Sequence, residues 1–298
     1  MTTDRGVRLD FLTSPSAFLD TAGEWLSREP VIGTVVATMA QRGLAAVRSG
    51  LALPADDWWL VVRDGPEVVG AGMRSAPFTP RPLFLLPMPD QAAVALARAL
   101  VERGEEVLAL NGALPATRVC ADELARLTGQ RVEVAVQSRL HQAPRVVRPR
   151  EPEGRLRQAT LAELGLARRW FAAFLAEADA QAGRPAGSHA GEVPRPEEMR
   201  SRLEDGQIWL WEVDGEPTHL TALNPPSFGV ARIGPVYTPQ EHRGHGYAGA
   251  TVAALTERVL EAGDVPCLFT DLANPISNAL YARIGYEPLV DMANFVLT

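Results

Sequence analysis

The sequence has few of the residues that mark secreted, metal-binding or nucleic-acid-binding proteins. Only two cysteines occur among 298 residues, Cys120 and Cys267, which is too few for a disulfide framework and gives no CxxC spacing for zinc. The five histidines show no metal-ligand spacing, so we expect no bound metal. The formal net charge of −7 leaves no basic surplus to neutralise phosphates, so we expect no nucleic-acid partner.

Long apolar runs are also missing. No run approaches the ~18 residues that span a bilayer, and residues 1–15 lack the apolar core of a signal peptide. We therefore expect a cytoplasmic protein with reduced thiols and no membrane partner. The content of 46% hydrophobic and 22% charged residues is typical of a globular protein, and the length is enough for two domains. The sequence does not indicate the oligomeric state.

The first half of the chain alternates helical and extended patterns. Two apolar runs flank Asp64-Gly65, which is a strong hairpin signal. Before this hairpin we expect helical structure over residues 16–48 with a break at Pro30. After it we expect a strand, a helix, a strand, a helix and a strand over residues 83–86, 92–103, 107–110, 121–128 and 132–136.

A similar order returns in the second half. Residues 143–154 are rich in Arg and Pro and are expected to form a linker. Beyond it a second hairpin is predicted around Asp214-Gly215. The other expected elements are a helix, a Gly/Pro-rich loop, a short helix, a strand, a longer helix and a strand over residues 161–178, 183–196, 196–203, 231–237, 250–262 and 267–272.

The two halves align residue by residue. Trp59-Leu60 matches Trp209-Leu210 at an offset of 150, as does the Asp-Gly pair of each hairpin. Farther along, Val94 matches Val252 at an offset of 158, so eight extra residues fall between strand and helix of the second copy. This period is far longer than the ~20–50 residues of solenoid repeats. We interpret it as two duplicated domains, residues 1–142 and 155–298, with chance similarity as the alternative.

The extra residues fall on a loop that begins at Gln240 and contains Arg243-Gly244-His245-Gly246-Tyr247-Ala248. Glycines let a backbone approach a ligand closely and adopt left-handed dihedrals. The start of the following helix presents unpaired N–H groups at its positive end. These features favour a phosphate or pyrophosphate site, with Arg243 as an additional cation. The alternative is a tight turn that binds nothing.

The same residues fit the pattern Arg/Gln-x-x-Gly-x-Gly/Ala, and here the chain resembles the acetyl-CoA-binding loop of the GNAT N-acetyltransferase superfamily. The resemblance continues through residues 271–275, 278–281 and 284–286. It covers residues 155–298 directly and the first half only through the repeat. It implies an α/β fold of two tandem GNAT-like domains, each a mixed, mostly antiparallel central sheet flanked by helices. It also implies acetyl-CoA as the cosubstrate.

The resemblance assigns roles to individual residues. The strand that ends at Val236-Tyr237-Thr238 would pair with the pantetheine arm of the cosubstrate. Asn274 would bond the amides of that arm, or cap the following helix. Tyr281 would return a proton to the leaving thiolate, or serve as a core tyrosine. The cofactor-binding set implied in this way is Val236, Tyr237, Thr238, Arg243, Gly244, His245, Gly246, Tyr247, Ala248, Asn274, Asn278 and Tyr281.

The expected activity is transfer of an acetyl group from acetyl-CoA to the primary amine of a small molecule or peptide. The alternative is a non-catalytic acyl-CoA-binding sensor or interaction module. The first copy lacks the glycine loop and has Ala121 or Ala125 opposite Tyr281, so we expect it to be degenerate. Residues 161–198 and 224–230 are expected to line the acceptor pocket. The carboxylates that lie near the site in sequence, without singling out a base, are Glu212, Glu241 and Asp271.

Overall fold

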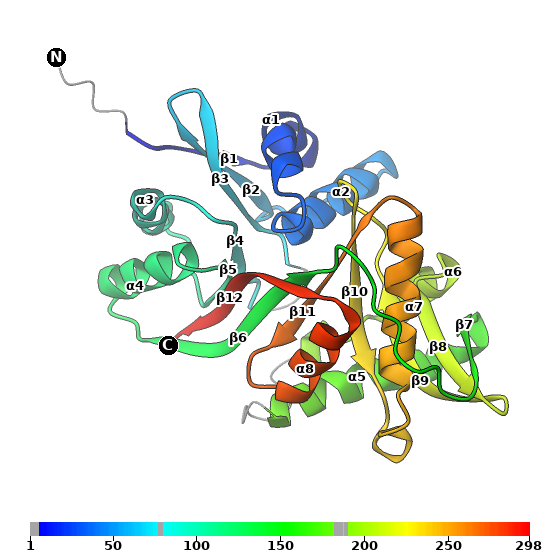
Figure 1. The fold of residues 1–298 in the computed structure, drawn as a ribbon. Helices are drawn as coiled ribbons and strands as arrows, with labels where there is room; N and C mark the ends of the chain where they lie inside the picture. Colours follow the sequence, from blue (N-terminus) through cyan, green and yellow to red (C-terminus); the bar gives the residue numbers. More distant parts are fainter. Residues whose placement is uncertain (1–5, 77–79, 182–186, 188–189) are drawn as a thin grey trace. The chain divides into compact units, whose positions relative to one another are not determined.

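A computed structural model describes residues 6–76, 80–181, 187 and 190–298 (Figure 1). Contacts divide the chain into two compact units, which are unit 1 (Met1–Ser138 with Val290–Thr298) and unit 2 (Arg139–Leu289). Part of the loop expected over residues 183–196 lies outside the described residues. Within the described part of the chain, no helix has both the length and the apolar character needed to cross a membrane.

Each unit alternates strands and helices in chain order. The elements of unit 1 are β1 (Arg8–Leu12), α1 (Pro15–Arg28), α2 (Thr34–Arg48), β2 (Trp58–Asp64), β3 (Glu67–Arg74), β4 (Leu83–Leu85), α3 (Asp90–Glu102), β5 (Ala109–Ala113), α4 (Ala116–Thr128), most of β6 (Val132–Gln142) and most of β12 (Glu287–Leu297). Those of unit 2 are β7 (Arg155–Gln158), η1 (Leu161–Glu163), α5 (Leu164–Gln181), η2 (Ala190–Glu192), α6 (Pro196–Glu204), β8 (Ile208–Val213), β9 (Glu216–Leu223), β10 (Val230–Tyr237), η3 (Gln240–His242), α7 (Tyr247–Glu261), β11 (Val265–Asp271) and α8 (Pro275–Ile284).

Most predicted elements are present, and the helical break near Pro30 is confirmed. Helix α1 begins after Ser14, whose hydroxyl accepts a hydrogen bond from the Ala17 N–H at 3.3 Å, and ends at Arg28. Strands β1 and β7, which open the two units, were not predicted. Each is short and alternates charged with apolar residues, so neither forms the apolar run that signals a buried strand.

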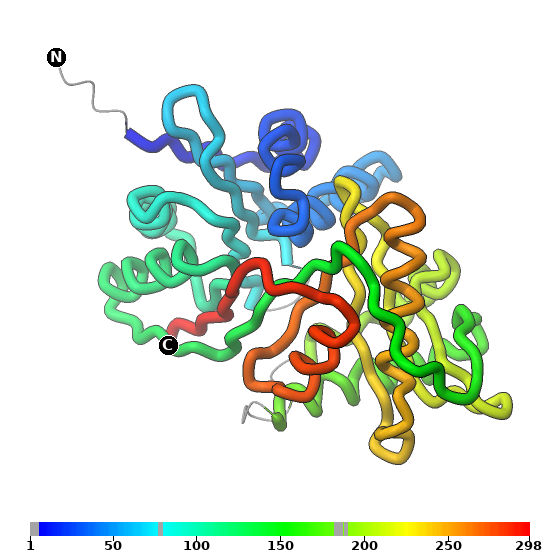
Figure 2. Tube along the Cα trace, in the orientation of Figure 1, coloured from blue at the N-terminus to red at the C-terminus, as the bar shows by residue number. Residues whose placement is uncertain are grey.

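The sheet of unit 1 is completed by the C-terminal strand of the chain, red in Figure 2. The strand order is β1-β2-β3-β4-β5-β12, antiparallel except for the parallel pair β4–β5. Strand β12 pairs antiparallel with β5 from Met292↔Ala113 to Val296↔Ala109. The expected domains, residues 1–142 and 155–298, remain a prediction. They assign residues 290–298 to the second domain, whereas the contacts assign these residues to unit 1.

Both faces of the unit 1 sheet are covered by helices. Side chains alternate along β2, as they must in a strand. Trp58 and Leu60 pack in one apolar cluster with α3 and α4, whereas Trp59 and Val61 pack in another with α1 and α2. Residues 58–62 of β2 are all apolar because the strand is buried on both faces.

Unit 2 repeats this architecture. Its strands run β11-β10-β9-β8-β7, with β10–β11 parallel and the other pairs antiparallel. Helices α5 and α6 pack on one face of the sheet and α7 and α8 on the other. Each unit therefore has the predicted mixed, mostly antiparallel sheet flanked by helices, and the two units share one order of elements.

The residue-level alignment of the two hairpins was wrong by one position. The first turn is Gly65-Pro66, closed by the pair Asp64↔Glu67, whereas the second is residues 214–215, closed by Val213↔Glu216. The structural offset at the hairpins is therefore 149, and Leu60 rather than Trp59 corresponds to Trp209. A shift of one residue moves a side chain to the opposite face of a sheet. Accordingly Trp209 packs with α7 and α8.

The segment over residues 143–154 is irregular, as expected of a linker, but it is fixed along unit 2. The Ala143 N–H donates to the Pro266 carbonyl at 3.0 Å. Near the end of the segment, Gly154 has a φ of +106° and lies so close to β8 that a Cβ there would be 2.3 Å from the Glu212 carbonyl oxygen. The segment therefore holds β7 against β8 in addition to connecting two halves of the chain.

Candidate functional site

Strands β10 and β11 separate partway along their length. Their pairing begins at Val230↔Val265 and ends at Arg232↔Cys267, although β10 continues to Tyr237 along β9. The register with β9 shifts by one residue between Ile233 and Val236, which is a β-bulge and bends the strand. Residues 233–237 therefore have a backbone edge that β11 does not pair, and an extended ligand can bind to such an edge.

The glycine loop continues from this strand to helix α7. Gly244 and Gly246 have φ values of +82° and +88°, and Gly246 is the N-cap of α7. Non-glycine residues avoid this left-handed region. A Cβ at either position would meet no atom within 4 Å, so backbone conformation and not crowding requires glycine here.

The loop presents a run of unpaired donors. Among the residues that the structure describes, none accepts a hydrogen bond from the backbone N–H groups of residues 244–249, whereas the Ala250 N–H is bonded to the Gly246 carbonyl at 3.0 Å. Six successive N–H groups at the positive end of a fifteen-residue helix make a concavity of the kind that can bind an anion. The predicted loop residues from Gly244 to Ala248 are thus brought together in one place.

Arg243 has protein partners beside this concavity. Its Nε donates to the Thr238 carbonyl at 2.9 Å, and its Nη2 forms an ion pair with Glu177 of α5. The same carboxylate accepts a hydrogen bond from the Tyr237 hydroxyl at 3.1 Å. Burial and the neighbouring carboxylate raise the pKa of Tyr237 to about 12. The predicted residues Tyr237, Thr238 and Arg243 therefore form one cluster at the end of β10.

Thr238 is also anchored to a buried histidine that no sequence pattern singled out. His219 of β9 is fully buried, with Nδ1 2.7 Å from the Thr238 hydroxyl and Nε2 2.7 Å from the Thr221 hydroxyl. Desolvation lowers the pKa of His219 to about 3, so the ring is neutral. Two threonine partners hold it, which fixes the chain where β10 leaves the sheet.

Asn274 and Asn278 organise the turn between β11 and α8. Asn274 is the N-cap of α8, its side-chain oxygen accepting from the Ser277 N–H at 3.1 Å, and its Nδ2 donates to Gln181 of α5 at 2.8 Å. Asn278 donates to the carbonyl oxygens of Asp271 and Asn274 at 3.1 and 2.9 Å. The capping interpretation of Asn274 is confirmed, and contact with a ligand stays a prediction.

Tyr281 lies on α8 within the apolar cluster of unit 2. Its side chain is 6% exposed, and its ring meets that of Tyr286 edge-on at 6.0 Å. No hydrogen-bond partner for the Tyr281 hydroxyl occurs among the described residues. Burial raises the pKa of Tyr281, which keeps the phenol protonated but weakens it as an acid toward a thiolate, whose conjugate acid has a pKa of about 8.5.

The remaining loop side chains stack against the start of α7. The ring of Tyr247 lies 6.4 Å from Trp211 and 5.4 Å from His245, and both pairs are stacked. The exposed His245 thus packs on Tyr247. Val236 is partly buried against the same apolar cluster as Tyr281.

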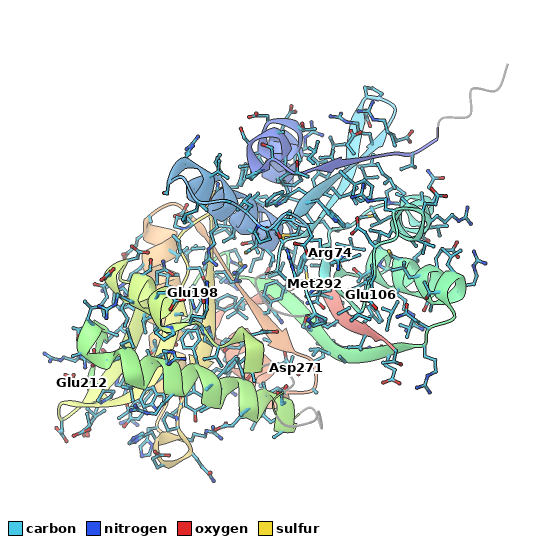
Figure 3. All side chains as sticks on the ribbon, turned by 180° about the vertical axis from the view of Figure 1, so that it is seen from behind. Arg74, Glu106, Glu198, Glu212, Asp271 and Met292 are labelled. Carbon is cyan, nitrogen blue, oxygen red and sulfur yellow. The ribbon has the colours of Figure 1, made fainter. Side chains whose placement is uncertain are left out.

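The three carboxylates considered as bases have structural partners or an exposed position. Glu212, labelled in Figure 3, accepts from Arg155 at 2.8 Å and from Arg157 at 2.5 Å, and these bonds lower its pKa. A lowered pKa makes a weaker base. Asp271, also labelled, accepts from the Ala273 N–H at 2.8 Å in the turn after β11, and Glu241 is exposed on η3.

The described residues of unit 1 include no counterpart of this site. Strand β4 pairs with β5 up to its last residue, Leu85↔Gly112, so these two strands do not separate. A Cβ at Gly112 would be 2.1 Å from the Leu85 carbonyl oxygen, which shows how closely the strands approach. Only four residues, 86–89, connect β4 to α3, whereas nine, 238–246, connect β10 to α7.

Sequence patterns did not reveal Glu177 and Gln181 as site residues. They lie one helical turn apart near the end of α5, and their partners are Tyr237 at the end of β10 and Asn274, the N-cap of α8. The i, i+4 spacing shows that they share a helix face, but only the fold shows what that face contacts. The predicted acceptor segment over residues 161–198 includes both.

Comparison with known proteins agrees with this geometry. Residues 223–295 match the model of the family described as FR47-like protein. This match contains the end of β9, β10, the glycine loop, α7, β11, α8 and most of β12. No curated protein matches the chain significantly.

Solved structures of acetyltransferases share the fold over nearly the whole chain. A GNAT-family acetyltransferase from Colwellia psychrerythraea has a TM-score of 0.55 at 14% identity, covering 98% of this chain and 100% of the other. A GCN5-related N-acetyltransferase from Sphaerobacter thermophilus has a TM-score of 0.57 at 16% identity, covering 99% and 96%. A tandem GNAT protein from the clavulanic acid biosynthesis pathway has a TM-score of 0.53 at 17% identity, covering 97% and 98%.

The fold is therefore that of two tandem GNAT-like domains. Together the FR47-like match and these structures support membership of the GNAT superfamily. Of the two units, unit 2 holds the separated strands and the glycine loop.

Proposed function

We propose that the protein is an acetyl-CoA-dependent N-acetyltransferase that acts on the primary amine of a small molecule or peptide. The observation that carries this proposal is the run of six unpaired N–H groups over residues 244–249, beside a β10 edge that β11 leaves unpaired. The N–H groups would hold the diphosphate, and the edge over residues 233–237 would bind the pantetheine arm by strand addition. The thioester supplies an activated acyl group.

The chain's own residues would position the arm and manage protons. His219 lies 2.7 Å from the Thr238 hydroxyl and is itself held by the Thr221 hydroxyl at 2.7 Å, which fixes the last backbone groups of the β10 edge. Asn274 and Asn278 hold the start of α8, three to seven residues before Tyr281. Tyr281 would provide the proton that a leaving thiolate needs, since its raised pKa keeps the phenol protonated.

A non-catalytic acyl-CoA sensor is the second candidate, and the burial of Tyr281 favours it. The Tyr281 side chain is 6% exposed and has no hydrogen-bond partner among the described residues, which fits a packing role in the core as well as a catalytic role. The two functions share the acyl-CoA site and differ only in whether an amine is acetylated.

Two measurements test the proposal. Calorimetric titration with coenzyme A should show one site per chain, because β4 and β5 pair to the end of β4 and only four residues connect β4 to α3 in unit 1. A thiol-release assay with acetyl-CoA and a panel of primary amines should then show amine-dependent release. Failure to bind coenzyme A would refute both functions, whereas binding without release for any amine would leave the sensor.

A further inference from the structure

Helix α5 contacts both sides of the opening between β10 and β11. Glu177 accepts a hydrogen bond from Tyr237, the last residue of β10, at 3.1 Å. One turn later Gln181 accepts from Asn274, which precedes α8 beyond the end of β11, at 2.8 Å. Because residues i and i+4 lie on one face of a helix, the last turns of α5 present this face to both strand ends.

The surroundings of Glu177 suit an organic cation. Its side chain is 38% exposed, so a ligand can reach it. Trp170 lies two turns earlier on the same face of α5, and its ring is 6.1 Å from that of Tyr237. A carboxylate beside aromatic rings attracts an ammonium group through charge and through the ring faces.

The cation that occupies Glu177 in this structure is Arg243. Their ion pair is exposed, with Arg243 44% accessible. Arg243 also lies in the glycine loop, directly before the N–H groups of residues 244–249. While Glu177 is paired with it, the carboxylate offsets the positive charge that a diphosphate on the loop would attract. The two ligands of the proposed reaction therefore depend on one ion pair.

We propose that Glu177 is the acceptor-binding carboxylate, and that Arg243 occupies it until a diphosphate on the loop attracts the guanidinium. This inference rests on the proposed function and adds the substrate class, a protonated primary amine with an apolar or aromatic body beside the charge. Each ligand then removes a competitor of the other, so coenzyme A and the amine increase each other's affinity, as linkage requires.

The experiment measures the affinity for coenzyme A by calorimetry in wild type, Glu177→Gln and Glu257→Gln. Glu257 is the matched control because it also forms an exposed ion pair in unit 2, with Arg148, and its replacement changes net charge equally. Because Glu177 competes with the diphosphate for Arg243, its removal should increase the affinity for coenzyme A by about two- to fivefold, as expected for an exposed ion pair. We expect this gain in Glu177→Gln and a smaller one in Glu257→Gln.

The second arm repeats the titrations with millimolar benzylammonium chloride, and with benzyl alcohol plus equal sodium chloride as the uncharged control. The ammonium compound should tighten coenzyme A binding in wild type and leave Glu177→Gln unchanged. Equal affinity in the two variants, or no effect of benzylammonium on wild type, would overturn the role of Glu177. Wild type that fails to bind coenzyme A would instead refute the proposed function. Circular dichroism of Glu177→Gln and of Glu177→Ala checks that both variants fold.

Discussion

Arg232 and Cys267 are the last residues at which β10 and β11 pair. In unit 1 the corresponding parallel strands are β4 and β5. They stay paired up to Leu85, the final residue of β4, which pairs with Gly112. One fold thus occurs in an open and a closed form within a single chain. The open form coincides with the glycine loop, and this coincidence confines the candidate site to unit 2.

The affinity of the protein for coenzyme A should depend on the backbone conformation of Gly244. Alanine at a φ of +82° costs roughly 1 kcal/mol, and the strain should move N–H groups out of place. We expect Gly244→Ala to weaken coenzyme A binding about tenfold, the equivalent of one lost hydrogen bond to a charged group, as measured by calorimetry.

Gly263→Ala is the matched control for this substitution. Gly263 has the same φ of +82° with nothing within 4 Å, but it follows the C-terminus of α7. Its replacement should lower the free energy of unfolding equally without changing affinity. Similar affinity losses in the two variants would show that the loop does not hold the ligand.

The role of Tyr281 can be separated from its packing. Tyr281→Phe removes a hydroxyl that has no partner among the described residues, so the free energy of unfolding should change by less than about 0.5 kcal/mol. If Tyr281 donates the proton, turnover should fall about 10²-fold while the affinity for coenzyme A stays within twofold. Steady-state kinetics and calorimetry measure the two quantities.

Tyr286→Phe should affect stability and not turnover, the opposite of what we expect for Tyr281→Phe. The Tyr286 hydroxyl is bonded to Thr256 at 2.7 Å in the same cluster, so its loss should cost about 1 kcal/mol of stability and leave turnover unchanged. Unchanged turnover in Tyr281→Phe would remove the proton-donor role and favour the sensor.

The C-terminal strand should stabilise unit 1, although it follows unit 2 in sequence. Phe295 is 2% exposed and packs in the cluster formed with α3 and α4. Phe295→Ala should therefore cost about 3–5 kcal/mol and increase hydrogen exchange in residues 109–113 of β5. Val296→Ala, at a position that is 37% exposed, should have a small effect. Increased exchange confined to unit 2 would contradict this assignment.

Acid should destabilise unit 2 through His219. The pKa of this ring is about 3 in the folded protein, against an ordinary value of 6.5. The folded state therefore favours the neutral ring, so its contribution is fully present above pH 6.5 and is lost as pH falls toward 3. Urea titrations across this range should show a loss on the order of a few kcal/mol.

His219→Asn should reduce this pH dependence, whereas replacement of the exposed His245 by Gln should preserve it. If the urea midpoint of His219→Asn falls with acid as steeply as that of wild type, another group is responsible.

Local chemistry specified much of the fold. The Asp-Gly pairs predicted both hairpins, Pro30 predicted the break between α1 and α2, and the two glycines between Arg243 and Ala248 predicted a loop that leads into a helix. These features depend on neighbouring residues, whose dihedral preferences and spacing are visible in sequence. The repeat likewise revealed the duplication, although a slip of one residue matched Trp59 with Trp209, which packs on the opposite face of its sheet.

Tertiary structure decided the relationships between distant segments. One is the pairing of β12 with β5, and another is the separation of β10 from β11 after Arg232. A third is the contact of Glu177 with Tyr237 and Arg243, which lie 60 or more positions away in sequence. Such contacts depend on which faces and edges meet after folding, and each involves ordinary residues with no local signature. The sequence by itself determined that a glycine loop leads from β10 into α7, and only the tertiary structure decided which carboxylate lies beside it.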